Sequence, residues 1–214
     1  MILGPTGVPP AEVGLNDETY ERWQKTFDVQ SVVFVTELLP FIWELFPRGF
    51  HEATLLDVGP CTAAGTAFLE YLHAPTSFSR LKLKCTAIDL EGVYADYARR
   101  HFPNVDYVVG DIYDHAFRDK FDIVICSHTI EHVPEPARFL ARLQQLARNR
   151  VIVAAPFDEE PRLEGHVNRL GYDFFEKNGA LKIHLYRSMT WHNSLACVAT
   201  FWGSGNGPLI GGRP

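Results

Sequence analysis

The sequence lacks the cysteine patterns that mark disulfide scaffolds and small zinc modules. Its 214 residues include only four cysteines, which lie far apart without a C-x-x-C pair or a Cys/His spacing typical of metal sites. Such cysteines are typical of reduced, mostly buried thiols in a cytoplasmic protein. The spacing of the possible ligands therefore predicts no metal site.

Basic residues and long apolar runs are also scarce. The formal net charge is −6, which argues against a protein that binds the phosphate backbone of a nucleic acid. No stretch approaches the roughly 18 apolar residues that a membrane span requires. Residues 1–5 show neither the basic region nor the apolar core of a secretory signal peptide. What remains, 46% hydrophobic and 21% charged residues, is the composition of one ordinary globular domain.

Residues 1–48 predict an N-terminal arm followed by a helical lid. Residues 1–14 contain three prolines and three glycines, so we expect an irregular arm there. Beyond it, Tyr20, Trp23 and Phe27 recur at helical spacing, and Pro40 predicts a break between two helices. An aromatic stripe of this kind more often packs in a core, but here it is also a candidate lid over an acceptor site.

From residue 49 onward the hydrophobic pattern changes its period. Short apolar runs at residues 54–58, 84–89, 105–109, 121–127 and 150–155 alternate with helical stretches. This alternation predicts right-handed βαβ units, and hence an α/β fold with a doubly wound parallel sheet. A short helix at 172–177 and two further strands at 181–188 and 195–202 are expected to complete the domain at residue 202. The tail, 203–214, holds five glycines and two prolines and is expected to be flexible.

Polar residues follow four of the predicted strands. Gly59 lies after the first strand, Asp89 ends the second, Asp111 follows the third, and residues 127–133 follow the fourth. Ligands of such sheets bind outside the carboxyl ends of the strands. Cys61 stands where a dinucleotide fingerprint has its second glycine, so a nicotinamide-dependent enzyme is a less favoured alternative.

These residues resemble the motifs of the class I S-adenosylmethionine-dependent methyltransferases, in particular a small branch with Glu-His-Val after the fourth strand. The segments that carry the resemblance are 55–59 (LLDVG), 87–89 (AID), 109–111 (VGD), 121–124 (FDIV) and 131–133 (EHV). The resemblance covers residues 50–202. It implies a Rossmann-like seven-stranded sheet, mostly parallel, with an antiparallel C-terminal edge pair that the two late strands would form.

The resemblance also implies a donor site for S-adenosyl-L-methionine, which would leave as S-adenosyl-L-homocysteine. The implied donor-binding residues are Asp57, Gly59, Cys61 and Ala63 for the methionine moiety, Asp89 for the ribose, Leu90, Asp111 and Ile112 for the adenine, and Ser127 and His128 to close the methionine side. The sequence departs from the family at Pro60, Cys61 and Ala63, where glycines are more common. Pro60 is expected to draw Gly59 into an extended conformation.

The loops after the fourth and fifth strands are expected to form the acceptor site. Methyl transfer requires alignment of donor and acceptor, and an oxygen acceptor of high pKa also requires a base. The candidate catalytic residues are His132, His166, His128 and Glu131. The run at 164–170 (EGHVNRL) resembles a segment of methyltransferases in bacterial polysaccharide and glycan pathways, although a plain solvated loop is nearly as compatible. The acids and histidines here are also compatible with a divalent metal that activates a sugar hydroxyl, but their spacing is not diagnostic.

The sequence therefore predicts a methyltransferase that acts on a small molecule or a sugar or glycan precursor, most plausibly at oxygen. The alternative is a catalytically inactive regulatory protein that binds S-adenosylmethionine, which the irregular first motif would permit.

Overall fold

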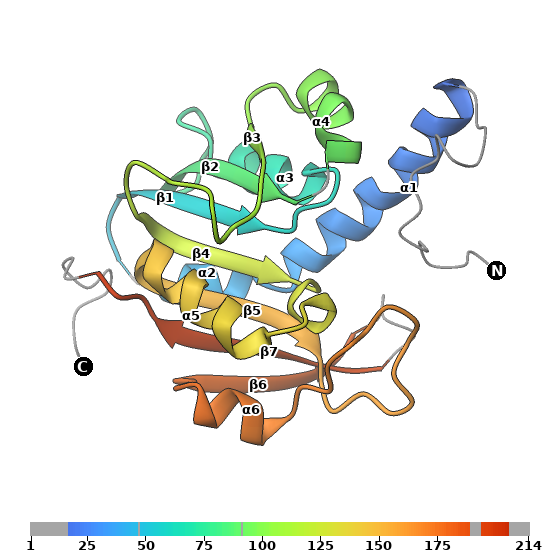
Figure 1. Cartoon of the computed structure of the whole chain (residues 1–214). Helices are drawn as coiled ribbons and strands as arrows, with labels where there is room; N and C mark the ends of the chain where they lie inside the picture. Colours follow the sequence, from blue (N-terminus) through green and yellow to red (C-terminus); the bar gives the residue numbers. More distant parts are fainter. Residues whose placement is uncertain (1–16, 47, 91, 189–193, 206–214) are drawn as a thin grey trace.

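The computed structural model describes residues 17–46, 48–90, 92–188 and 194–205 of the chain (Figure 1). The predicted arm at residues 1–14 and the side chains of Tyr20 and Trp23 lie outside this described part. The described residues form a single sheet with helices on both faces, so the predicted α/β class is confirmed.

The sheet has seven strands in the order β3-β2-β1-β4-β5-β7-β6. The strands are β1 (His51–Val58), β2 (Leu81–Asp89), β3 (Asp106–Val109), β4 (Phe121–Ser127), β5 (Ala147–Pro156), β6 (Lys182–Arg187) and β7 (Leu195–Trp202). The first five strands pair in parallel, whereas β7 runs antiparallel to both β5 and β6. This is the mostly parallel sheet with an antiparallel edge pair that the sequence predicts. Because the strand order reverses between β1 and β4, the carboxyl ends of these strands form the crevice where ligands of doubly wound sheets bind.

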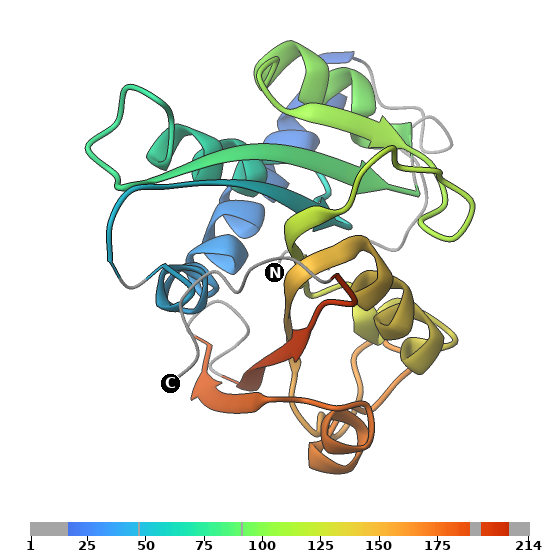
Figure 2. The ribbon, with the colours of Figure 1, turned by 90° about the vertical axis from the view of Figure 1, so that its left-hand side faces the viewer.

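Strand side chains alternate between two hydrophobic cores, because successive residues of a strand point to opposite faces. In β1, Leu56 and Val58 join the core beneath α5 (Pro136–Leu146) and α6 (Tyr172–Lys177). Leu55 joins the opposite core, together with residues of α2 (Leu39–Glu44) and α3 (Ala64–Leu72). The view turned by 90° places α5 on the opposite side of the sheet from α2 and α3 (Figure 2). A third cluster joins α4 (Ala95–His101) to α1 (Asp17–Thr36).

The predicted helix break at Pro40 is confirmed. Helix α1 ends at Thr36, and Pro40 occupies the first turn of α2, where its missing N–H costs no hydrogen bond. By length and composition alone, Gln24–Glu44 could cross a membrane, contrary to the expectation that no stretch approaches such a span. In the structure this stretch is two helices, with Leu38 and Ile42 fully buried in the core.

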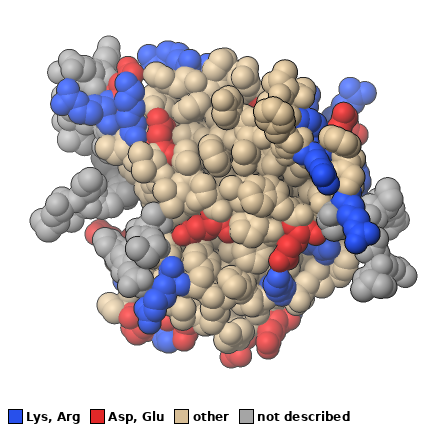
Figure 3. Space-filling model, turned by 180° about the vertical axis from the view of Figure 1, so that it is seen from behind, with Lys and Arg blue, Asp and Glu red and all other residues tan. Residues whose placement is uncertain are grey.

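The four cysteines are free, and three of them are buried, which confirms the prediction of reduced, mostly buried thiols. Seen from behind, the surface carries its lysines and arginines mainly toward its edges, whereas acidic residues lie across the middle below a largely uncharged upper part (Figure 3). At the end of the chain, Gly203 and Ser204 donate backbone hydrogen bonds to the carbonyls of Asn149 and Gln144. The tail from residue 206 onward lies outside the described residues.

Candidate active site

A cavity of about 640 Å³ opens at the carboxyl ends of β1, β2, β3 and β4. This volume lies within the usual range for small-molecule sites. One wall consists of the strand tips and the loops after them. The other wall is a single face of α1, which contributes Phe27, Gln30, Ser31, Phe34 and Val35. These residues recur at intervals of three and four, so α1 covers the cavity as one continuous helix face.

The loop after β1 begins with a glycine that no other residue could replace without strain. Gly59 has a φ of +75°, and a Cβ built on it would come within 2.3 Å of the Thr129 hydroxyl oxygen. Its N–H donates to the Ile88 carbonyl at 2.9 Å, which ties the loop to β2. The expectation that Pro60 draws Gly59 into an extended conformation is wrong, because the close approach of Thr129 selects a left-handed backbone that glycine alone adopts freely.

Two further residues of this loop adopt the left-handed backbone conformation although neither is glycine. Cys61 and Ala63 have φ values of 57° and 62°. Two hydrogen bonds hold the Cys61 backbone in place. Its N–H donates to Asp89 Oδ2 at 3.2 Å, and its carbonyl accepts from the Tyr107 hydroxyl at 2.9 Å. Cys61 lines the cavity, but Ala63 does not. Ala63 is fully buried in the core near Phe27, so the structure does not bring it to the predicted donor site.

Asp57 lies at the floor of the cavity and is buried. It accepts a hydrogen bond of 2.7 Å from the Thr66 hydroxyl. Burial raises the pKa of Asp57 to about 7, because the hydrogen bond from Thr66 lowers it only in part and the charge of Asp89 adds to the rise. Asp57 therefore carries a proton over part of the physiological pH range.

The residues predicted for the ribose and adenine all lie on one wall. Asp89, Leu90, Asp111 and Ile112 line the cavity, and the Leu90 side chain is 69% exposed there. Asp111 Oδ1 accepts from the backbone N–H of Tyr113 at 2.8 Å, which shapes the turn after β3. The structure thus brings together a carboxylate at the end of β2, an apolar side chain and a second carboxylate, as the resemblance implies.

His128, at the tip of β4, is enclosed in a buried charged network. Its ring stacks on Phe34 with 4.0 Å between ring centroids. Its nitrogens lie 3.5 Å from Glu131 and 3.8 Å from Glu37, both carboxylates that are largely buried. Glu37 in turn accepts hydrogen bonds from the hydroxyls of Tyr186 and Ser188. The network thus links α1, the tip of β4 and strand β6.

The network fixes the charge of His128. Burial would lower the pKa of His128, but the interactions with Glu131 and Glu37 outweigh it and raise the pKa to about 9. Burial likewise acts to raise the pKa of Glu37, but its hydrogen bonds lower that pKa overall. A protonated, enclosed imidazolium cannot take a proton from an acceptor at neutral pH, so His128 does not fit the predicted role of base, although it does line the cavity.

The other three candidate catalytic residues form a second cluster beside the first. His132 is exposed and lines the cavity, and its Nδ1 lies 2.9 Å from the Gly165 carbonyl. His166 is buried behind it, with 4.7 Å between the two ring centroids, and its Nδ1 lies 2.6 Å from Glu159. Glu131 is also buried and does not line the cavity. Of the four candidates, only His132 is both exposed and on the cavity wall, with one ring nitrogen bonded to a backbone carbonyl.

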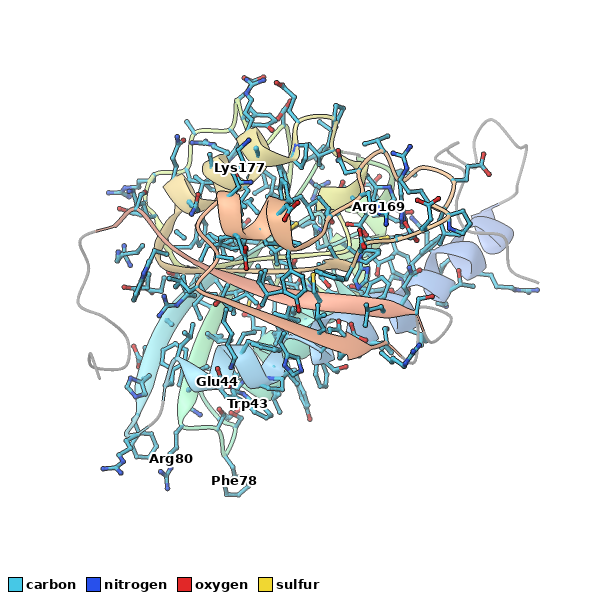
Figure 4. The ribbon with its side chains drawn as sticks, turned by 90° about the horizontal axis from the view of Figure 1, so that it is seen from below. Trp43, Glu44, Phe78, Arg80, Arg169 and Lys177 are labelled. Atoms are coloured by element: carbon cyan, nitrogen blue, oxygen red, sulfur yellow. The ribbon has the colours of Figure 1, made fainter. Side chains whose placement is uncertain are left out.

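The segment around His166 is tightly held by the turn after β4. Val167 N–H donates to the Glu131 carbonyl at 2.9 Å, and the Asn168 side chain donates to the Val133 carbonyl at 2.5 Å. Arg169, which lies at the same end of the sheet as the cavity (Figure 4), forms ion pairs with Asp158 and Glu160. Asn168 and Arg169 thus stabilise the loop instead of facing an acceptor, and their bonds place His166 against His132.

The sequence interpretation missed several residues of the cavity wall. Gln30, Ser31 and Phe34 continue the helical spacing from Phe27, so the pattern contained a signal for them. Tyr94 and Tyr113 follow predicted strands without any distinguishing motif. Glu37 had no signal at all, because its partners on β6 are more than a hundred residues away in the chain.

Comparisons with known proteins agree with this geometry. A family model described as a methyltransferase domain matches residues 56–155, which run from β1 to β5. A search of the curated proteins found no match.

Solved structures similar to this chain share its fold at low identity. One is the protein solved in complex with the Haloferax volcanii Trm112 methyltransferase activator, with a TM-score of 0.65, 12% identity, and coverage of 89% of this chain and 96% of that chain. Another is the 1,6-didemethyltoxoflavin-N1-methyltransferase of Burkholderia thailandensis, solved with 1,6-didemethyltoxoflavin and S-adenosylhomocysteine, with a TM-score of 0.60, 16% identity, and coverage of 94% and 93%. The cyclase SpnF has a TM-score of 0.59, 14% identity, and coverage of 79% and 81%. Similarity at this level establishes the fold alone, and the acceptor must be argued from the site.

Proposed function

We propose that this chain, which a methyltransferase-domain model matches over residues 56–155, is a class I, S-adenosylmethionine-dependent methyltransferase whose acceptor is an oxygen atom of a small molecule or of a sugar or glycan precursor. The observation that carries this proposal is the position of His132 on the cavity wall, beside the loop after β5. An oxygen acceptor of high pKa requires a group that handles its proton, and an exposed histidine suits that task.

We assign the strand tips to the donor. The ribose hydroxyls of the donor would bind Asp89, and the adenine would pack on Leu90 with its amino group directed to Asp111. The methionine moiety would follow Gly59 and Cys61 toward Ser127. These residues line one cavity, and Gly59, where the loop leaves β1, has no side chain to project into it.

We assign the acceptor proton to Nε2 of His132. The bond from Nδ1–H to the Gly165 carbonyl selects the tautomer whose lone pair is on Nε2. As the acceptor oxygen attacks the methyl carbon, its O–H bond breaks toward this nitrogen. The new C–O bond forms while the C–S bond breaks, and S-adenosylhomocysteine leaves with the electron pair. The face of α1 over the cavity would help to align the two substrates.

Donor binding tests the first assignment. In a calorimetric titration with S-adenosylmethionine, Asp89→Ala should weaken binding by about 100-fold, because it removes two hydrogen bonds to a charged group, each worth about 1.5 kcal/mol or more. Asp119→Ala, an exposed aspartate away from the cavity, is the matched control. Unchanged donor affinity in Asp89→Ala would show that the ribose assignment is wrong.

Turnover tests the acceptor. Methyl transfer from a labelled donor would be measured against sugar nucleotides, phenols and lipid alcohols, with the methylated atom located by mass spectrometry and NMR. His132→Ala should lower kcat by about 10²-fold or more while donor affinity stays within twofold. His184→Ala, an exposed histidine on β6 that does not line the cavity, should leave kcat unchanged. Methylation only at nitrogen or carbon would overturn the oxygen assignment.

A further inference from the structure

We propose that Glu131, His132 and His166 bind one divalent cation of the zinc type at the acceptor end of the cavity. Each residue offers one ligand atom, and the three atoms lie within 4.8 Å of one another. They come from two separate loops, the turn after β4 and the loop after β5, which backbone hydrogen bonds fasten together. Spacing along the chain is not diagnostic of this cluster, because the two loops meet only in the folded protein.

The carboxylate of Glu131 is the first observation that points to a cation. Glu131 is 1% exposed, and neither of its carboxylate oxygens has a hydrogen-bond partner among the described residues. The nearest positive group is Nδ1 of His128, at 3.5 Å. Burying a carboxylate without hydrogen bonds is costly, and coordination of a metal is one of the two usual compensations. A cation bound directly by Glu131 would compensate its carboxylate more closely than the His128 ring at 3.5 Å does.

The two histidines are the second observation, because both are oriented as metal ligands usually are. Nδ1 of His166 bonds to the Glu159 carboxylate at 2.6 Å, and Nδ1 of His132 bonds to the Gly165 carbonyl at 2.9 Å. Ligating histidines almost always donate their other N–H to a carboxylate or a backbone carbonyl. In this tautomer, both rings carry the lone pair on Nε2, which is the form that binds a metal.

The surrounding charge also favours a cation. Three carboxylates, Glu37, Glu131 and Glu159, lie in contact with two imidazoles, His128 and His166. Because the carboxylates outnumber the imidazoles, the group keeps a net negative charge whichever of the two rings carries a proton. A divalent cation therefore reduces the net charge of a largely buried group instead of adding to it.

The donor set identifies the class of cation. Two imidazole nitrogens and one carboxylate oxygen suit zinc and cobalt, whereas magnesium and calcium prefer oxygen ligands. Zinc bonds of about 2.1 Å place tetrahedral ligand atoms about 3.4 Å apart, so the most distant ligand atoms must approach each other by up to about 1.4 Å. His132 is exposed and can make that adjustment. Three protein ligands leave a fourth position open, as in catalytic zinc sites, and His132 is the one of the three that lines the cavity.

The use of this cation in catalysis rests on the proposed function, whereas its binding does not. A hydroxyl acceptor at the fourth position would lose its proton more readily, as water does on zinc, and the proton would pass to solvent. Nε2 of His132 would then hold the cation and no longer act as the base. The two roles exclude each other, so the protein with and without the cation should differ in how turnover depends on Glu131.

A cobalt titration of the full chain, first treated with a chelator, tests the proposal without any acceptor. We expect one cobalt ion per chain, with the visible absorption of a four- or five-coordinate site, and displacement by zinc. Glu131→Gln and His166→Asn should each weaken cobalt binding by at least 10²-fold. Glu159→Gln, which removes only the partner of His166, should weaken it by about 10- to 100-fold.

Matched controls separate the site from general unfolding. Glu176→Gln and His184→Asn change exposed residues of the same types and should leave cobalt binding unchanged. Retained affinity for S-adenosylmethionine shows that each variant is folded. Absence of stoichiometric cobalt binding, or equal binding by wild type and Glu131→Gln, would overturn the proposal. If cobalt binds as expected but methyl transfer to oxygen is the same with and without the cation, the site would stand and its catalytic use would be wrong.

Discussion

The two ends of the cavity, which we propose bind the donor and the acceptor, are held in place by different kinds of interaction. At the donor end, the loop after β1 takes its shape from left-handed backbone at Gly59 and Cys61 and from hydrogen bonds to main-chain atoms. At the acceptor end, the tip of β4 is held by buried ionisable side chains, with His128 between Glu37 and Glu131. Backbone conformation thus fixes the structure of the donor end, whereas interactions between buried charges fix that of the acceptor end.

This difference predicts different responses to substitution. A loop defined by its φ values should tolerate a change of side chain that preserves the backbone, and should fail when the backbone must move. A buried charged network should respond in the opposite way, because the loss of one charge leaves its partners buried without compensation. The substitutions below test each half of this comparison.

The largest effect is expected at His128. His128→Asn keeps a residue that tolerates the left-handed backbone at this position, where φ is 50°. It leaves Glu37 and Glu131 buried without the imidazolium between them, which should lower the free energy of unfolding by about 3–5 kcal/mol. Urea denaturation at pH 7 measures this change.

A second substitution identifies the cause of that loss. In the double variant His128→Asn with Glu131→Gln, one of the two stranded charges is also removed, so part of the lost stability should return. If the single variant loses less than about 1 kcal/mol, or if the double variant is simply the sum of both losses, charge does not hold the acceptor end together.

Gly59 is the corresponding test at the donor end. Gly59→Ala must accept a φ of +75° and places its Cβ against the Thr129 hydroxyl. The left-handed backbone costs about 1–2 kcal/mol and the overlap about 1–3 kcal/mol, and donor affinity should fall because the loop must move. Gly179→Ala is the matched control, because Gly179 has a φ of +81° with nothing within 4 Å of the added carbon. Equal losses in both variants would mean that the approach of Thr129 has no effect.

Asp57 provides a test that depends on pH. Folding raises its pKa to about 7, while an unfolded aspartate has a pKa near 3.9. Because the folded state holds the proton more tightly, the stability contributed by Asp57 is complete below about pH 4 and is lost as the pH rises through 7. Between pH 5 and pH 7 this loss amounts to about 2 kcal/mol, at roughly 1.4 kcal/mol per pH unit.

The comparison of two stability profiles isolates this contribution from that of other groups. Asp57→Asn, measured without donor, should lose less stability than wild type between pH 5 and pH 7. Asp119→Asn, which changes an exposed carboxylate, should parallel the wild-type profile. If the profile of Asp57→Asn is also parallel to that of wild type, Asp57 does not titrate near neutral pH.

The fold was predictable from the sequence because local patterns encode it. Strand β4 was predicted with its exact ends, because a buried strand of a parallel sheet consists of a short apolar run, and here polar residues mark both ends of that run. Pro40 marked the helix break for a local reason as well, because proline lacks the N–H that a helix interior needs. The edge pair followed from two separate strands and from the family resemblance.

The site was less predictable wherever it depends on contacts between distant segments. Asp89 and Asp111 were found because the first ends a strand and the second follows one closely. The protonation of His128 was not, because it depends on Glu37 and on the burial that α1 provides. His166 was placed among the candidates, but its contact with His132 depends on hydrogen bonds between two loops. Ala63 was misplaced because a left-handed residue turns the chain into the core just after the cavity wall.

The smallest effect is expected at Cys61, and it separates backbone from side chain at the donor end. Burial raises the pKa of the Cys61 thiol to about 12, so the thiol is neither a nucleophile nor a charge. Its φ of 57° is left-handed, and its N–H and carbonyl carry the contacts to Asp89 and Tyr107. Replacement of Cys61 by glycine relieves about 1–2 kcal/mol of backbone strain. It also raises the conformational entropy of the unfolded chain, which costs about 0.5–1 kcal/mol of stability, and it removes the packing of the side chain.

Cys61→Gly should therefore change the free energy of unfolding by less than about 1 kcal/mol and keep donor affinity within about threefold. Cys61→Val is the matched opposite, because a β-branched residue does not adopt this φ without strain, so the loop must move and donor affinity should fall by about tenfold. Denaturation and donor titration of both variants provide the measurement. If glycine weakens donor binding as much as valine, the thiol itself contacts the donor, and the donor end depends on its side chains as much as the acceptor end does.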